Sequence, residues 1–106
     1  EYDTVIAEQN GSIVGFGDMD ASGYLDRLYV HKDCQGRGVA SAICAWLERR
    51  SAAAEYITHA SLTARPFLER RGWQAVREQE VERRGVWLKN VVMRKRRPEA
   101  TEKEKV

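Results

Sequence analysis

The residues best suited to chemistry lie in one short stretch, Gln35-Gly36-Arg37-Gly38-Val39-Ala40, between a predicted strand and a predicted amphipathic helix. A glycine-rich turn at a helix N-terminus exposes unpaired backbone N–H groups at the positive end of the helix dipole. Because Gly36 and Gly38 lack side chains, phosphate oxygens can approach these groups, and Arg37 can add a charge-assisted contact. The stretch predicts a pyrophosphate site. The alternative is an ordinary surface turn in which glycine supplies a positive φ.

The same stretch does not fit two common nucleotide-binding motifs. No Gly-Lys-Ser/Thr follows it, as a P-loop requires, and Ser41 stands where a dinucleotide fingerprint has its third glycine. ATPase and dehydrogenase activities are therefore disfavoured. The charge distribution agrees with a polyanion at this end of the fold, because residues 1–34 have a net charge of −5 and residues 35–97 a net charge of +8.

Length and composition predict one soluble globular domain. The chain has 106 residues, 42% of them apolar and 32% charged, which supports a single packed core. It shows no apolar run of ~20 residues that could cross a membrane and no signal-peptide pattern. The two cysteines, Cys34 and Cys44, have neither a CxxC partner nor the histidine spacing of a zinc site, so we predict no metal and a cytoplasmic location. We expect Cys44 to be buried and Cys34 to be exposed in a polar loop.

Three strands are predicted upstream of the glycine-rich stretch. Residues 4–7 and 12–17 flank Asn10-Gly11, which is typical of a tight hairpin turn, and residues 24–30 form the third strand. We therefore expect a three-stranded antiparallel meander. Alternation along the third strand predicts that one face carries Tyr24, Asp26, Leu28 and Val30.

Downstream, the hydrophobic period changes to that of a helix beginning near Gly38. A buried strand over residues 56–60 follows, and then a short helix with Thr63 as N-cap that ends at Gly72. Two closing strands, residues 73–80 and 86–95, surround a turn at Arg84-Gly85. The order β-β-β-α-β-α-β-β predicts a mixed α/β fold over residues 1–97, with a disordered charged tail over residues 98–106.

These features resemble the Gcn5-related N-acetyltransferase (GNAT) superfamily. Its signature is an apolar strand, a short polar loop, and Gln/Arg-x-x-Gly-x-Gly/Ala opening the main helix, which Gln35, Gly38 and Ala40 match. Residues 64–73 look like the family's second conserved helix, which ends in Gly followed by an aromatic residue. The closing residues 81–93 are similar to the YafP-like bacterial branch, and the whole resemblance covers about residues 2–96.

The resemblance implies acetyl-CoA as cosubstrate and direct transfer of the acetyl group to an amine. In such folds the acetyl-pantetheine arm pairs like an extra strand with the backbone of the central strand, here Leu28, Tyr29 and Val30. The pyrophosphate lies on the loop formed by Gln35, Gly36, Arg37, Gly38, Val39 and Ala40. Ser61 stands where the family often has an Asn that contacts pantetheine, and its hydroxyl could replace part of that bond.

Acetyl transfer to an amine needs a base for the ammonium proton and a donor for the developing oxyanion. We expect Asp26 to be the base, because it is predicted to share a strand face with Leu28 and Val30, where an apolar wall can raise a carboxyl pKa. Tyr24 is the second candidate, acting through a water molecule. A purely structural role for Asp26 stays open. A backbone N–H near Tyr29 is the expected oxyanion donor.

The sequence departs from the family in two places. Many members have a Tyr general acid four residues before the helix-ending Gly, where this chain has Leu68. His59 could substitute, although we expect a lone histidine on a buried strand to be a core residue. Members also begin with a strand and two helices before the meander, so we expect an N-terminally truncated domain whose free edge would favour a homodimer.

We therefore predict an N-acetyltransferase for a small cationic amine, because Asp18, Asp20 and Asp26 gather on the hairpin and third strand. The alternative is a non-catalytic CoA-binding or regulatory module, which Leu68 motivates. A nucleic-acid partner is disfavoured, because no aromatic residue interleaves the basic run Arg94-Lys95-Arg96-Arg97. No membrane partner is expected.

Overall fold

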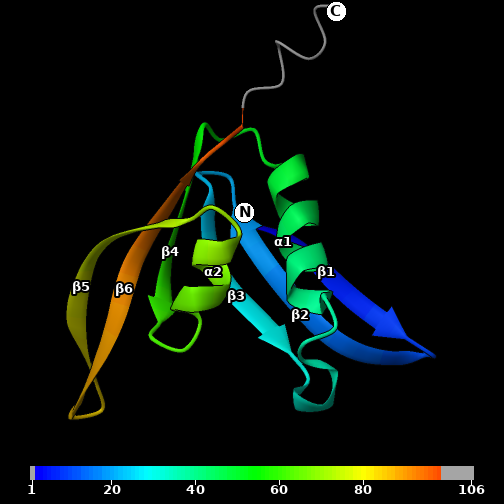
Figure 1. Ribbon diagram of the computed structural model, residues 1–106, viewed down its shortest axis with the longest axis horizontal. Helices are drawn as coiled ribbons and strands as arrows, with labels where there is room; N and C mark the ends of the chain where they lie inside the picture. The colour runs from blue at the N-terminus through cyan, green and yellow to red at the C-terminus, as the bar shows by residue number, and fades with distance from the viewer. Residues whose placement is uncertain (1, 99–106) are drawn as a thin grey trace, which may run out of the picture.

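Over residues 2–98, which it describes, the computed structural model forms one six-stranded sheet and two α-helices (Figure 1). The strands lie in the order β1-β2-β3-β4-β6-β5, and all neighbours are antiparallel except β3 and β4. Their bounds are β1 (Tyr2–Gln9), β2 (Ser12–Asp20), β3 (Tyr24–Val30), β4 (Glu55–Ser61), β5 (Gln74–Arg83) and β6 (Val86–Arg96). The helices are α1 (Val39–Arg50) and α2 (Arg65–Arg70), with a short 3₁₀ helix at Lys32–Cys34. The mixed α/β fold and its element order are confirmed.

The predicted meander is present as β1, β2 and β3. Asn10 and Gly11 both have positive φ, 53° and 80°, as a two-residue hairpin turn requires. Arg84 and Gly85 repeat this geometry, with φ of 55° and 80°, between β5 and β6. Both turns were correctly predicted, and β5 and β6 are each slightly longer than expected.

Helix α1 crosses the meander and covers one face of it (Figure 1). Its buried side chains, Ile43, Cys44 and Leu47, recur at helical spacing, and Arg49 and Arg50 lie in the last turn, where the helix dipole favours cations. The helix approaches β2 closely because β2 has glycines where the two elements are in contact. A Cβ on Gly17 would lie only 2.8 Å from Cγ2 of Ile43.

Helix α2 starts later than predicted. Ala64, not Thr63, is its N-cap residue, and Pro66 lies in its first turn, where proline needs no hydrogen-bond donor. The hydroxyl that serves this start belongs to Ser61, whose Oγ accepts from the Ala64 N–H at 3.1 Å. Thr63 as N-cap is therefore wrong. The helix is anchored by Leu68, which is 2% exposed.

Strand β4 is buried on one face only. Tyr56, Thr58 and Ala60 are buried, whereas His59 is exposed. The expectation that His59 is a core residue is therefore wrong, because the alternation turns it away from the helices. Thr58 Oγ1 donates to the Leu25 carbonyl at 2.7 Å and ties β4 to β3.

Both helices lie on the same face of the sheet (Figure 1), and their buried side chains join one core with β2, β3, β4 and β6. On the other face, Tyr2, Ile6 and Tyr29 are exposed. Within residues 2–98, no helix is long and apolar enough to span a membrane. Apart from Pro98, the predicted tail lies outside the described residues.

Candidate active site

A bulge in β3 shapes the site. Asp18 pairs with Arg27 but Met19 pairs with Leu25, so Asp26 has no partner on β2. The bulge reverses the alternation, and Leu25 and Leu28, three residues apart, both pack against the core. The predicted common face of Tyr24, Asp26, Leu28 and Val30 is therefore wrong. Asp26 is exposed at the bulge.

Strands β3 and β4 separate beyond the start of β3. The two strands pair only at Tyr24↔Ile57 and Leu25↔Thr58 and then diverge (Figure 1). Beyond Leu25, this edge of β3 pairs with no strand of the described chain, so its backbone groups can accept an extended ligand.

Asp18 holds the bulge in place. Its carboxylate, 2% exposed, accepts from the Arg27 backbone N–H at 3.0 Å and from Arg27 Nε and Nη2 at 2.8 and 2.5 Å. Asp20 is also engaged, because its Oδ1 accepts from the Ser22 hydroxyl at 2.6 Å and from the Tyr24 and Ser22 backbone N–H groups, and these bonds lower its pKa. Asp18 and Asp20 are therefore already engaged within the protein. Of the three carboxylates in the predicted acidic cluster, only Asp26 has no such fixed role.

The glycine-rich loop delivers unpaired donors to the start of α1. Gly36 and Gly38 both have positive φ, 79° and 83°, which glycine adopts without strain. Gly38 is the N-cap residue, with no side-chain cap, and the first intrahelical bond runs from the Ala42 N–H to the Gly38 carbonyl at 3.0 Å. The N–H groups of the first turn before Ala42 therefore lack helical acceptors and face an approaching anion.

These donors border a cavity of about 550 Å³. Its walls are β3, the loop with the first turn of α1, and α2. The cavity is lined by Leu28, Val30, Cys34, Gln35, Gly36, Gly38, Val39, Ala40, Ser41, Ala64, Phe67 and Arg70. Apolar walls with a few polar groups are typical of a small-molecule site.

Seven of the ten predicted cofactor residues line this cavity: Leu28, Val30, Gln35, Gly36, Gly38, Val39 and Ala40. Three do not. Tyr29 lies on the other face of β3, with its ring 5.7 Å from that of Phe16. Arg37 is exposed beside the cavity, and the Ser61 hydroxyl is engaged at the start of α2.

The cavity also contains residues that the sequence did not indicate. Cys34 was expected to be exposed, but it is only 9% exposed and lines the wall, because the 3₁₀ turn capped by His31 folds it inward. Phe67 and Arg70 come from α2, whose helical spacing places both on the cavity side.

The two candidate bases, Tyr24 and Asp26, lie on β3 at the bulge. Burial, followed by the negative charges of Asp26 and Asp20, raises the pKa of Tyr24, so its phenol is neutral at neutral pH. The Tyr24 ring meets His59 edge-on at a centroid distance of 5.5 Å. The negative charge of the Asp26 carboxylate also raises the pKa of Tyr2, the first residue of β1.

Comparison with known proteins agrees with this architecture. The family model described as the acetyltransferase (GNAT) domain matches residues 1–96. The chain is 45% identical over 71 residues to the uncharacterized N-acetyltransferase YafP of Escherichia coli (strain K12), which covers 67% of this chain and 46% of that protein. The chain thus spans about half the length of this relative.

Solved structures share the fold. A GCN5-related N-acetyltransferase from Rhodopseudomonas palustris matches with a TM-score of 0.86 at 34% identity, over 90% of this chain and 61% of that one. The acetyltransferase yncA from Salmonella typhimurium, solved with its cofactor acetyl-CoA, matches with a TM-score of 0.75 at 17% identity, over 93% and 66% of the two chains. The chain therefore belongs to the GNAT acetyltransferase family.

Proposed function

We propose that this chain binds acetyl-CoA and transfers its acetyl group to the primary amine of a small acceptor. One observation carries the proposal: the unpaired N–H groups at the start of α1 open onto a cavity whose other wall is the unpaired edge of β3. A diphosphate joined to an extended amide chain matches both features. The acetyl-CoA bound to yncA supports this identification.

In this proposal the pyrophosphate accepts hydrogen bonds from the N–H groups of the loop and first helical turn. The pantetheine arm runs along Leu28, Tyr29 and Val30, whose backbone supplies the pairing even though the Tyr29 side chain points away. Arg37 and Arg70 add positive charge at the phosphate end. Ser61 stays a candidate contact, although its hydroxyl already serves α2.

The chemical step needs three roles from this chain. Asp26, directly or through a water molecule that the neutral Tyr24 phenol orients, takes the proton from the ammonium group, which frees the amine lone pair. The nitrogen bonds to the acetyl carbon while the carbon–sulfur bond breaks, and a backbone N–H near Tyr29 stabilises the negative charge on the acetyl oxygen. The newly bonded nitrogen gives up its second proton to a water molecule, and the sulfur leaves as a thiolate that takes a proton from the same water, since a thiol pKa of about 8.5 makes it a good leaving group.

The acceptor is proposed to be a small amine that is cationic before it reacts. Asp26 and the tyrosines around it offer the negative charge and hydrogen-bond acceptors that an ammonium group requires.

We further propose a cytoplasmic location and no nucleic-acid partner. In the basic run, Arg94 lies 3.8 Å from Glu55 and Lys95 lies 2.9 Å from Glu48, so acidic side chains already engage two of its four charges.

The second candidate, a CoA-binding module without catalysis, is favoured by Leu68, which is buried in the core where a general acid is common in the family. An assay of free thiol release from acetyl-CoA with amino sugars, polyamines and amino acids separates the two. Amine-dependent release supports the enzyme. CoA binding without release with any amine supports the module, and absence of CoA binding contradicts both.

A further inference from the structure

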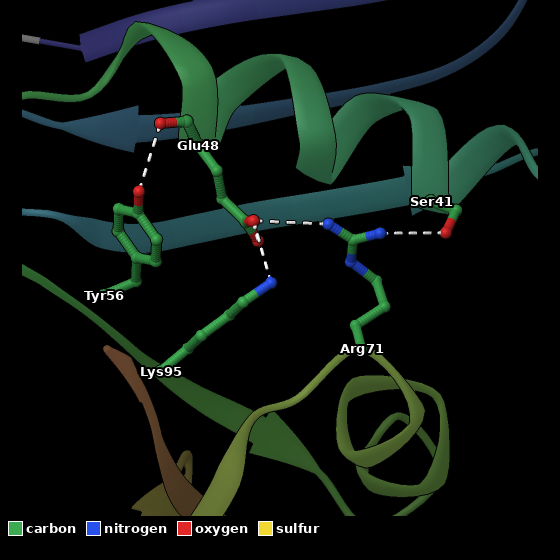
Figure 2. Close-up of polar contacts among 5 residues, drawn as sticks. All are labelled: Ser41, Glu48, Tyr56, Arg71 and Lys95. Carbon is green, nitrogen blue, oxygen red and sulfur yellow. Dashed lines mark hydrogen bonds and ion pairs between the residues drawn. The ribbon is translucent and has the colours of Figure 1, made fainter. Parts of the chain in front are cut away.

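A cluster of charged side chains lies between α1, the end of α2 and β6 (Figure 2). Glu48 Oε1 accepts from Lys95 Nζ at 2.9 Å and from Arg71 Nη2 at 3.3 Å. The side chains of Glu48, Arg71 and Lys95 are only 11%, 18% and 14% exposed. These contacts join residues far apart in the chain.

Arg71 also reaches the wall of the cavity. Its Nη1 donates to Ser41 Oγ at 3.0 Å, and Figure 2 shows the guanidinium lying between Ser41 and Glu48. Arg71 is the residue that ends α2, and Ser41 lies in the first turn of α1. Both helices supply cavity residues, so this side chain connects the two walls across which a ligand would lie.

The need of Glu48 for a positively charged partner does not by itself explain the position of Arg71. Lys95 already provides Glu48 with a cation at a shorter distance, so the cluster contains one cation more than it has anions. Arg71 Nε and Glu48 Oε2 are buried without a hydrogen-bond partner. A buried cluster of charges like this one is weak evidence that Arg71 stabilises the fold, because the cost of removing the charges from water opposes their mutual attraction. What Arg71 contributes beyond Lys95 is the link to Ser41 and a positive charge near the start of α1.

We propose that Arg71 is a positioning residue for the cofactor site. By bonding to both Ser41 and Glu48 of α1, Arg71 fixes the end of α2 against the first turn of α1 and keeps the N–H groups of that turn aimed into the cavity. This inference rests on the proposed function, since it takes a CoA phosphate as the anion that these groups receive.

The test compares variants of two cations that share one carboxylate. Arg71→Gln removes the link to Ser41, whereas Lys95→Met removes a Glu48 partner but leaves that link intact. Titration calorimetry with CoA and thermal unfolding are measured for each protein. We expect both variants to unfold at lower temperature. Arg71→Gln should bind CoA about tenfold more weakly (about 1.4 kcal/mol), and Lys95→Met within about twofold of the unmodified chain.

A third variant keeps the test informative if Arg71→Gln does not fold. Arg71→Lys preserves the charge but lacks the planar fork that spans two partners, so it should fold and bind CoA at least about threefold more weakly. Unchanged affinity in the Arg71 variants, or an equal loss in Lys95→Met, overturns the positioning role. If the unmodified chain does not bind CoA, the proposed function itself fails, which is a different result.

Discussion

Gly38 offers the sharpest test of where the phosphate lies. It is the N-cap residue of α1, and a Cβ added to it would meet nothing within 4 Å. A side chain there therefore projects into open space at the start of α1 rather than into the protein. Gly38→Asp, Gly38→Asn and Gly38→Ala form a matched series that separates charge, shape and backbone strain.

Strain should cost all three variants a modest amount of stability. The φ of Gly38 is 83°, and a residue with a Cβ in this region costs roughly 1–2 kcal/mol, less for Asn and Asp. For Asp, the carboxylate at the helix N-terminus returns roughly 0.3–1 kcal/mol. We therefore expect Gly38→Asp to remain folded, with a net destabilisation of about 1 kcal/mol.

The effect on CoA affinity should be much larger for Asp than for Asn. At a separation of ~5 Å, two unit charges repel by about 1 kcal/mol in water and about 3 kcal/mol at an effective dielectric constant of 20. A pyrophosphate with two charges would lose roughly 2–6 kcal/mol, which is a loss of affinity of about 30-fold or more. Gly38→Ala and Gly38→Asn should stay within about fivefold of the unmodified chain, since neither adds charge.

Titration calorimetry at low and high salt measures this difference, with circular dichroism as the check on folding. Because added salt screens the repulsion between exposed charges, the gap between the Asp and Asn variants should narrow as ionic strength rises. Equal CoA affinities for the two variants at low salt would refute the placement of the pyrophosphate at the start of α1.

Three further predictions concern catalysis, packing and thiol reactivity. Asp26→Asn should lower turnover by roughly 10²–10⁴ with little change in CoA affinity, and the deficit should shrink as pH rises and more of the amine is already neutral; near-normal activity at pH 7 would transfer the role elsewhere. Gly17→Ala should destabilise the fold by about 1–3 kcal/mol, because its Cβ would lie 2.8 Å from Ile43, and a melting temperature equal to that of the unmodified chain would contradict this packing. Burial raises the pKa of Cys44 to about 11, so at pH 8 a thiol reagent should modify Cys34, in the cavity wall, faster than Cys44. Bound CoA should slow the reaction at Cys34. Equal rates with and without CoA would show that the reagent does not reach Cys34 through the cavity.

Local patterns predicted much of this fold because they depend on neighbours in the chain. The turn at Asn10-Gly11 needs only its own two residues, and α1 follows from apolar side chains at helical spacing. The loop before α1 could likewise be identified as a candidate anion site, because the requirement for free N–H groups is local.

The errors arose where one residue or one distant partner decides the outcome. A bulge at Asp26 reverses the faces of β3, and the regular alternation assumed from Tyr24 to Val30 does not allow for it. Helix α2 starts later than predicted because Ser61 supplies the oxygen that was expected from Thr63. The link from Arg71 to Ser41 joins positions 30 residues apart, so only the folded chain shows it.

The most direct test of the central claim is an NMR titration of the chain with acetyl-CoA, followed through its backbone amides. The account predicts that the largest shift changes fall on Gly36, Gly38 and the first turn of α1, with a second set along β3 from Leu28 to Val30. Saturation without changes at these amides, or changes centred on the basic residues at the end of β6, would contradict it.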